Sequence, residues 1–179
     1  AITGVDLVEW QLRVAAGEPL PRTQSELSIS GHAFEARLYA EDAPAGFLPA
    51  TGTLTHLRFT DGARADTGVR AGDTISPYYD PMIAKLVVWG EDRETAIRKM
   101  TKAIEDFDIV GIQTTMTFCK YAINHESFVS GDFDTNFVKH YFSDPNILDV
   151  SDPDALEVAA IAHINHRICL DTKEMSWVP

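Results

Sequence analysis

The chain has 179 residues, of which 45% are hydrophobic, so it is long enough for one globular domain with a short appendage. A formal net charge of −12 and a pI of about 4.8 argue against nucleic acid as a partner, because the chain would repel a phosphate backbone. No apolar run reaches membrane-spanning length and no signal peptide opens the sequence, so neither a membrane span nor secretion is predicted.

The first predicted element is a helix. Thr3 is expected to cap its start, and Gly17 is expected to end it. Leu7, Trp10 and Val14 fall on one stripe, which predicts an apolar face. Because this helix begins almost at once and the first residue is not methionine, we expect a fragment of a longer protein.

Residues 27–40 are predicted to form a strand with one charged face. Side chains on a strand alternate, which turns these residues toward a core: Phe34, Ala36, Leu38 and Ala40. The opposite face then carries Glu35, Arg37, Tyr39 and Glu41. A guanidinium keeps its proton and carries five donors in a fixed fork, which flanking carboxylates would orient. Two interpretations are open: a solvated ion-pair stripe on an edge strand, or an anion-stabilising site.

Two further strands are predicted at residues 53–59 and 64–70, joined by a hairpin turn at Asp61-Gly62, with the second at an edge. The segment 76–82 is unusual because two prolines bracket two tyrosines, including Tyr79, and Asp80. This rigid loop leads into residues 83–89. That stretch is apolar except for Lys85, which predicts a central strand buried on both faces.

Lys85 has two interpretations. It can be a lysine whose stem lies along apolar surface or whose charge meets a structural ion pair. It can instead be a functional partner for Asp80, or for the carboxylates near Arg37.

The clearest helix is predicted over residues 91–107 with Asp92 as its cap, followed by a short strand or connector at 109–112. A second helix is expected over 114–124, and Asp134 is expected to cap a last short helix. The order of elements predicts an α+β fold with a mainly antiparallel sheet flanked by helices. We expect one domain over residues 1–145, and an acidic linker with the truncated start of another module over 146–179.

Common catalytic and metal-binding motifs are missing from the sequence. It contains no glycine-rich phosphate loop, no Gly-x-Ser-x-Gly elbow and no Cys-x-x-Cys pair. His163 and His166 stand one helical turn apart without a third ligand nearby, so no metal site is predicted. Cys119 and Cys169 are far apart and indicate reduced thiols.

Three stretches together resemble the C-terminal domain of biotin carboxylases, the ATP-dependent components of acyl-CoA and pyruvate carboxylases. They are GHAFEARLYAED (31–42), GFLP (46–49) and SPYYDPMIAKL (76–86). TGVDLV (3–8), LRVAAG (12–17) and the helix around 92–100 match the same family in order, so the resemblance covers residues 1 to about 142. The tail resembles the spacer of the biotin-bearing subunit of propionyl- or methylcrotonyl-CoA carboxylases.

The resemblance implies a ligase that carboxylates the N1′ nitrogen of biotin with ATP, magnesium and bicarbonate. An ATP-grasp region upstream of this chain would bind the nucleotide, metal and bicarbonate, so the isolated chain is expected to be inactive. Arg37 matches the arginine that contacts the ureido group of biotin. Glu35 and Glu41 would orient it, and the remaining substrate-binding or supporting residues would be Tyr39, Tyr79, Asp80 and Lys85.

Arg64 aligns with an arginine at the family's dimer interface, although the aromatic residue found near it in some members is Asp61 here. The implied partners are the rest of the biotin carboxylase chain, a biotin carrier domain, a carboxyltransferase subunit and a possible second copy. The implied location is the cytoplasm, or the mitochondrial matrix in a eukaryote. The alternative is a non-catalytic dimerisation or assembly module of the same holoenzyme, in which Arg37 is structural.

Overall fold

The computed structural model describes residues 1–148, and the chain divides into two compact units, Ala1–Pro145 and Asn146–Pro179. The first unit has the predicted α+β architecture, and every strand pairing in its described residues is antiparallel. His163, His166 and Cys169 lie outside the described residues. The interpretation of 146–179 as linker and truncated module stays a prediction.

The first unit combines mostly short strands with a set of helices. The strands are β1 (His32–Tyr39), β2 (Glu41–Asp42), β3 (Leu48–Pro49), β4 (Gly52–Thr53), β5 (His56–Arg58), β6 (Arg64–Thr67), β7 (Thr74–Ile75), β8 (Met82–Gly90) and β9 (Asp108–Val110). The α-helices are α1 (Leu7–Ala15), α2 (Arg93–Glu105), α3 (Met116–Asn124), α4 (Glu126–Ser130) and α5 (Phe137–Tyr141), and short 3-10 turns cover Gln24–Glu26 and Pro145–Ile147. Within residues 1–148, no helix combines the length and apolarity that a membrane span requires.

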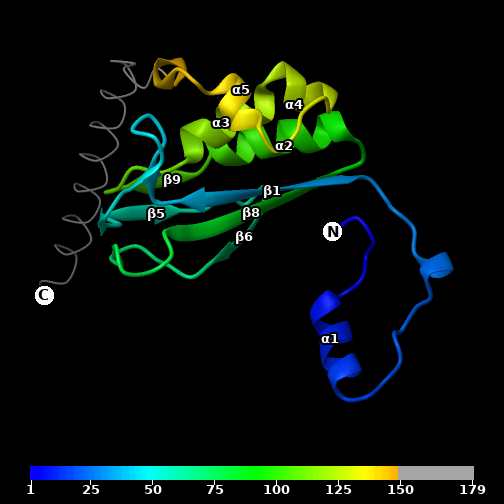
Figure 1. Cartoon of the computed structure of the whole chain (residues 1–179). Helices are drawn as coiled ribbons and strands as arrows, with labels where there is room; N and C mark the ends of the chain where they lie inside the picture. The colour runs from blue at the N-terminus through cyan, green and yellow to red at the C-terminus, as the bar shows by residue number, and fades with distance from the viewer. Residues whose placement is uncertain (149–179) are drawn as a thin grey trace, which may run out of the picture. The chain divides into compact units, whose positions relative to one another are not determined.

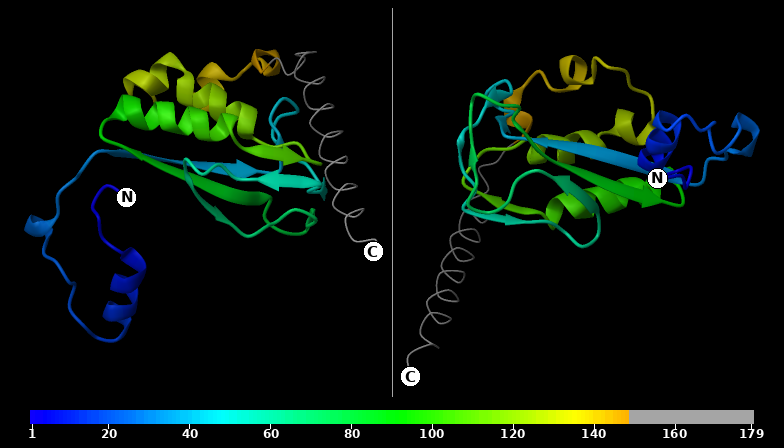
Figure 2. Two further views of the ribbon diagram at one scale, coloured as in Figure 1. Left: turned by 180° about the vertical axis from the view of Figure 1, so that it is seen from behind. Right: turned by 90° about the horizontal axis from the view of Figure 1, so that it is seen from below.

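A three-stranded sheet with the order β1-β8-β6 is the framework of the fold. Helix α2 packs against β1 and β8, and Figures 1 and 2 show α2, α3, α4 and α5 gathered on one side of this sheet. The core between them holds the fully buried Leu38, Leu86 and Met100. The opposite face of the sheet carries the charged side chains of β1, β8 and β6, and it is called the open face below.

The predicted central position of β8 is confirmed, but its predicted burial on both faces is wrong. Ile83, Leu86 and Val88 are buried, whereas Lys85 is half-buried and Trp89 is 38% exposed. Helices cover only the face that β8 turns toward α2, so the residues that alternate onto the open face keep contact with solvent.

The predicted hairpin at Asp61-Gly62 is also wrong. Strand β5 pairs with β9, and β6 pairs with β8. The stretch predicted as one strand over 53–59 is divided between β4 and β5, because Leu54 N donates to Asp73 O (2.9 Å) and Thr55 N donates to Val110 O (2.9 Å). The chain therefore changes partner between two adjacent residues, which a local turn signal does not reveal.

Strand β1 begins at His32 rather than at residue 27, because the chain turns at Gly31. Gly31 has a φ of +70°, and a Cβ there would lie 2.3 Å from the backbone oxygen of Gly90. Trp89 Nε1 donates to Ser30 O (2.9 Å) beside this turn. Glycine is therefore required where the N-terminal segment meets the end of β8.

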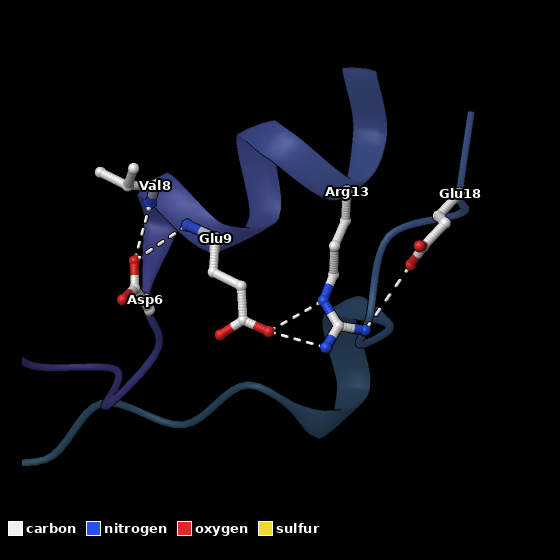
Figure 3. A network of polar contacts seen from close by, with 5 residues as sticks. All are labelled: Asp6, Val8, Glu9, Arg13 and Glu18. Atoms are coloured by element: carbon white, nitrogen blue, oxygen red, sulfur yellow. Dashed lines mark hydrogen bonds and ion pairs between the residues drawn. The ribbon is translucent and has the colours of Figure 1, made fainter. Parts of the chain in front are cut away.

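Helix α1 is capped by Asp6 and not by Thr3 as predicted. Asp6 Oδ1 accepts from Val8 N and Glu9 N, both at 3.0 Å, while Gly4 has a φ of +64° that is incompatible with an earlier helical start (Figure 3). Glu9 forms an i,i+4 ion pair with Arg13 (2.7 Å). None of the α1 residues is buried, so its apolar stripe does not join the core.

The two longer helices agree with the prediction in position and differ at their ends. Asp92 caps α2 as expected, and its Oδ1 accepts from Thr95 N (2.7 Å). Helix α2 ends at Glu105, and α3 begins at Met116 instead of residue 114. These differences of about two residues are usual for helix ends.

Candidate functional site

Arg37 lies on the open face of β1, and its direction is set by a neighbour on the same strand. Arg37 Nε donates to Glu35 Oε1 (3.1 Å), and the arginine side chain is 61% exposed. The hydrogen bond to Glu35, and then that to Tyr39, raises the pKa of the Arg37 guanidinium above its usual range. The predicted alternation of this strand is confirmed, and it presents a permanently charged donor group at a solvent-accessible surface.

Glu41 does not act as the second carboxylate beside Arg37. The register of β1 shifts between Leu38 and Tyr39, the regular strand ends at Tyr39, and Glu41 starts the separate strand β2. Burial, and then the nearby charge of Asp80, raises the pKa of the Glu41 carboxyl. The prediction that Glu35 and Glu41 both hold the arginine is therefore corrected: Glu35 contacts Arg37, and Glu41 faces Asp80.

The proline-bracketed loop between β7 and β8 places its two predicted site residues differently. Asp80 Oδ1 accepts from Met82 N (2.7 Å), and its charge acts on Glu41. Tyr79 is 85% exposed. The backbone of this loop is fixed to the end of β1, because Ala40 N donates to Pro81 O (2.8 Å). Asp80 is thus brought beside Glu41, and Tyr79 points to solvent.

Lys85 lies directly opposite Arg37 in the register of β1 and β8, and opposite Asp66 in the register of β8 and β6. Within residues 1–148, Lys85 forms no ion pair or hydrogen bond through its side chain. The described part of the chain therefore contains no ion pair between Lys85 and Asp80 or Glu35, which the functional interpretation of Lys85 had predicted.

Arg64 lies on the same open face and is held by Asp66, two residues along β6. Arg64 Nε and Nη2 donate to the two carboxylate oxygens of Asp66 at 2.9 and 2.8 Å. These hydrogen bonds lower the pKa of Asp66, and the charge of Lys85, directly opposite in the register of β8 and β6, lowers it further. Whether Arg64 contacts a second copy stays a prediction.

Sequence reasoning missed two residues that shape this surface, Asp66 and Thr115. Thr115 is buried, and its side-chain oxygen accepts from Tyr39 N (3.0 Å). The two residues are separated by 76 positions, so no local pattern could have indicated the contact. Asp66 lies in a stretch whose strand partner was predicted wrongly, and only the correct register places it beside Lys85.

The open face carries a cluster of positively charged side chains, which suit an anion. Its cations are Arg37 and Arg64, each held by a carboxylate, and Lys85, which lies opposite both Arg37 and Asp66 in the register of the sheet. Among the described residues there is no group of three or more His, Cys, Asp or Glu side chains that could bind a metal ion. A ligand with developing negative charge would meet fixed donors on this surface without reorganising them.

The sequence matches a known family across this surface. The family described as "Biotin carboxylase C-terminal domain" matches residues 35–140. Methylcrotonoyl-CoA carboxylase subunit alpha, mitochondrial, from Arabidopsis thaliana is 49% identical over 182 residues, covering 98% of this chain and 25% of the relative. The propionyl-CoA carboxylase alpha chain of Ruegeria pomeroyi is 40% identical over 190 residues, covering 93% of this chain and 28% of the relative. The chain thus spans about a quarter of the length of the curated relatives it matches.

Solved structures of biotin carboxylases are also similar to this chain. The biotin carboxylase domain of a thermophilic 2-oxoglutarate carboxylase bound to bicarbonate aligns with a TM-score of 0.78 and 36% identity, over 84% of this chain and 34% of that one. The biotin carboxylase subunit of a pyruvate carboxylase aligns with a TM-score of 0.76 and 33% identity, over 82% of this chain and 32% of that one. Both alignments agree with the α+β fold described above.

Proposed function

The chain belongs to the biotin carboxylase C-terminal domain family, and from this premise we propose that it completes the site at which a biotin-dependent acyl-CoA carboxylase carboxylates biotin. Arg37 is the principal catalytic group that the chain contributes. The observation that carries the proposal is the Arg37 guanidinium, oriented by Glu35 on the open face of a strand within the matched residues.

The chemistry requires a fixed positive group. Biotin accepts the carboxyl group once its N1′ nitrogen has lost a proton. Loss of that proton moves negative charge onto the ureido oxygen, which a guanidinium aimed at it stabilises more than it stabilises the neutral ground state. Arg37 suits this role because it stays charged and because Glu35 limits the directions its fork can take.

The remaining parts of the reaction belong to other segments of the protein. ATP, magnesium and bicarbonate would be bound by an upstream region, and the isolated chain would be inactive. Two related structures of a 2-oxoglutarate carboxylase domain contain bicarbonate, and one of them also contains magnesium and ADP. The chain covers only 34% and 33% of those domains, which is compatible with this division. The names of the curated relatives support an acyl-CoA carboxylase of the methylcrotonyl or propionyl type.

The same names support a set of partners and a location. A biotin carrier domain would present biotin to Arg37, and a carboxyltransferase subunit would receive the carboxyl group. A second copy of the chain is a further possible partner, since the biotin carboxylase domain of the Hydrogenobacter thermophilus 2-oxoglutarate carboxylase is a dimer. The protein would lie in the mitochondrial matrix if eukaryotic, which the word mitochondrial in the names of its plant and animal relatives supports, and in the cytoplasm otherwise.

The test is ATP cleavage by the full-length protein that contains this chain, measured with and without biotin and bicarbonate. We expect the full-length protein to cleave ATP faster when both are present, and the isolated chain to cleave none. If the full-length protein cleaves ATP at the same rate with and without biotin and bicarbonate, the proposal is contradicted.

A further inference from the structure

Phe47 has a backbone conformation that residues with a side chain rarely adopt. Within residues 1–148 it is the only non-glycine residue with a positive φ, at +62°. This left-handed region is unfavourable for a bulky residue and is populated mainly by glycine. The preceding Gly46 has a φ of +80°, so two consecutive left-handed residues turn the loop between β2 and β3. Strained residues persist only where their surroundings hold them, and they gather at functional sites.

Two aromatic rings hold Phe47 in this conformation. Its ring packs edge-to-face against Phe118 of α3, with ring centres 5.1 Å apart, and against Phe142, the residue that follows α5, at 5.8 Å. Phe118 and Phe142 also contact each other, at 5.1 Å, so the three rings form a closed cluster. Edge-to-face packing of aromatic rings is favourable. The cluster therefore attaches the β2–β3 loop to α3 and α5 and compensates the strain at Phe47.

The β2–β3 loop returns to the end of the strand that carries Arg37. Phe47 N donates to Asp42 O (2.8 Å), which closes the loop, and β3 pairs with β2 directly after it. Ala50 N then donates to Ala40 O (2.8 Å), one residue beyond the end of β1. Ala40 is fully buried, and it lies three residues from Arg37. A displacement of Phe47 is therefore expected to move the end of β1.

This support is needed because the pairing of β1 with β8 becomes irregular at the same point. The register shifts between Leu38 and Tyr39, just beyond Arg37. Past the shift, Ala40 is held on both of its peptide groups: its oxygen accepts from the segment after β3, and its nitrogen donates to Pro81 O (2.8 Å). Loops rather than a regular ladder of hydrogen bonds thus fix the chain beyond Arg37.

We propose that Phe47 is a positioning residue for Arg37: its ring, held by Phe118 and Phe142, fixes the β2–β3 loop and through it the end of β1. This inference rests on the proposed function of Arg37. The ion pair with Glu35 orients the arginine within β1, but it does not fix β1 against the rest of the protein, because both residues lie on that strand. A guanidinium must be aimed at the developing charge, and a misplacement of about 1 Å can cost roughly 100-fold in rate.

The experiment compares Phe47→Ala, Phe47→Gly and Phe47→Tyr in the full-length protein. Biotin-dependent ATP cleavage gives kcat and the KM for biotin, cleavage without biotin gives the bicarbonate-dependent background, and thermal unfolding gives Tm. Phe133→Ala is the matched control, because Phe133 stacks on Phe128 of α4, with ring centres 4.6 Å apart, and does not belong to the three-ring cluster.

We expect Phe47→Ala to lower the biotin-dependent kcat by roughly 10- to 100-fold, to change the KM for biotin less, and to keep the background cleavage. Phe47→Gly should lose the same activity because the ring is missing, but it should unfold at a higher Tm than Phe47→Ala, since glycine adopts a positive φ without strain. Phe47→Tyr keeps the ring and should keep most of the rate. Phe133→Ala should lower Tm without changing the biotin-dependent rate of the folded protein.

Two results would overturn the inference. If Phe47→Ala and Phe47→Gly keep the biotin-dependent rate within about twofold of wild type at equal folded fraction, Phe47 is structural only. If they lower the biotin-dependent and background rates equally, as general destabilisation would, Phe47 does not position Arg37. Either result with an inactive Arg37→Ala variant leaves the proposed function intact, whereas an Arg37→Ala variant with an unchanged biotin-dependent rate refutes that function separately.

Discussion

Thr115 holds both peptide groups of Tyr39, and so connects the end of the Arg37 strand to the start of α3. Tyr39 N donates to Thr115 Oγ1 at 3.0 Å, and Thr115 N donates to Tyr39 O at 3.0 Å. Thr115 is 4% exposed, so water cannot replace its hydroxyl. The two hydrogen bonds fix the backbone two residues from Arg37, at the point where the register of β1 shifts.

Replacing Thr115 with valine should destabilise the protein. The substitution keeps the shape of the side chain but leaves the amide of Tyr39 without an acceptor, which costs about 1–3 kcal/mol. Denaturant unfolding measures this loss, and Thr115→Ser is the control that keeps the hydroxyl. A Thr115→Val protein as stable as Thr115→Ser would show that this contact does not hold the strand.

The raised pKa of Glu41 predicts that the stability of the protein depends on pH. Burial, and then Asp80, raises the pKa of its carboxyl, so the folded protein binds this proton more tightly than the unfolded chain does. The contribution of Glu41 to stability is therefore present at low pH and is lost as pH rises from the usual carboxyl pKa through the raised one. Glu41→Gln should raise Tm at pH 7 and have less effect at pH 4.

The Asp80→Asn variant is the control for Glu41. It removes the neighbouring charge while keeping an oxygen that can accept from Met82 N. It should also raise Tm at pH 7, and the gain from the double variant should be smaller than the sum of the two single gains. A Tm of Glu41→Gln that falls at pH 7 would contradict this interpretation.

Arg93, the first residue of α2, should be important for stability rather than catalysis. Its guanidinium lies over the neighbouring rings of Phe34 and Phe128, at 5.2 and 5.3 Å from their centres. It also donates to the backbone oxygens of Phe128 and of Val129, the latter at 3.2 Å. Arg93→Met should therefore lower the free energy of unfolding by about 1–3 kcal/mol.

Arg98→Met on the same helix is the matched control for Arg93, because the hydrogen bond of Arg98 to Thr95 is long, at 3.4 Å. Denaturant unfolding should show a clear loss of unfolding free energy for Arg93→Met and little loss for Arg98→Met. If both variants lose the same free energy of unfolding, the contacts of Arg93 with the two phenylalanines do not stabilise the protein.

Cys119 should be an unreactive thiol. Desolvation raises its pKa to about 11, and its sulfur lies 3.9 Å from the backbone oxygen of Arg37. At pH 8 roughly one thiol in a thousand would be ionised, so iodoacetamide should modify Cys119 slowly in the folded protein and rapidly after denaturation. Mass spectrometry of the Cys119 peptide measures this, and rapid labelling of the native protein would contradict the raised pKa.

The sequence predicted those features of the fold that depend on local patterns. The alternation through Glu35 and Arg37 gave the faces of β1 correctly, because a strand has a period of two wherever it stays regular. The capping of α2 by Asp92 was correct for the same reason, since a cap depends on residues three positions away.

The incorrect predictions concern contacts between distant segments. The turn at Asp61-Gly62 was placed correctly between two strands, but their partners are set by β8 and β9, which lie far along the chain. Glu41 was assigned to Arg37 by extending the alternation past Tyr39, where the register shift and Thr115 end the strand. Neither the strand partners nor the end of β1 can be predicted from the neighbouring residues in the sequence.

The most direct test of the account is biotin-dependent ATP cleavage by the full-length protein, comparing wild type, Arg37→Ala and Arg37→Lys at equal folded fraction. We predict that Arg37→Ala lowers the biotin-dependent rate by roughly 100-fold or more, as for loss of a fixed donor to a developing oxyanion, while bicarbonate-dependent background cleavage is kept. Arg37→Lys should stay well below wild type, because lysine lacks the fork that Glu35 orients. An unchanged biotin-dependent rate in Arg37→Ala would contradict the account and would leave this domain as an assembly module.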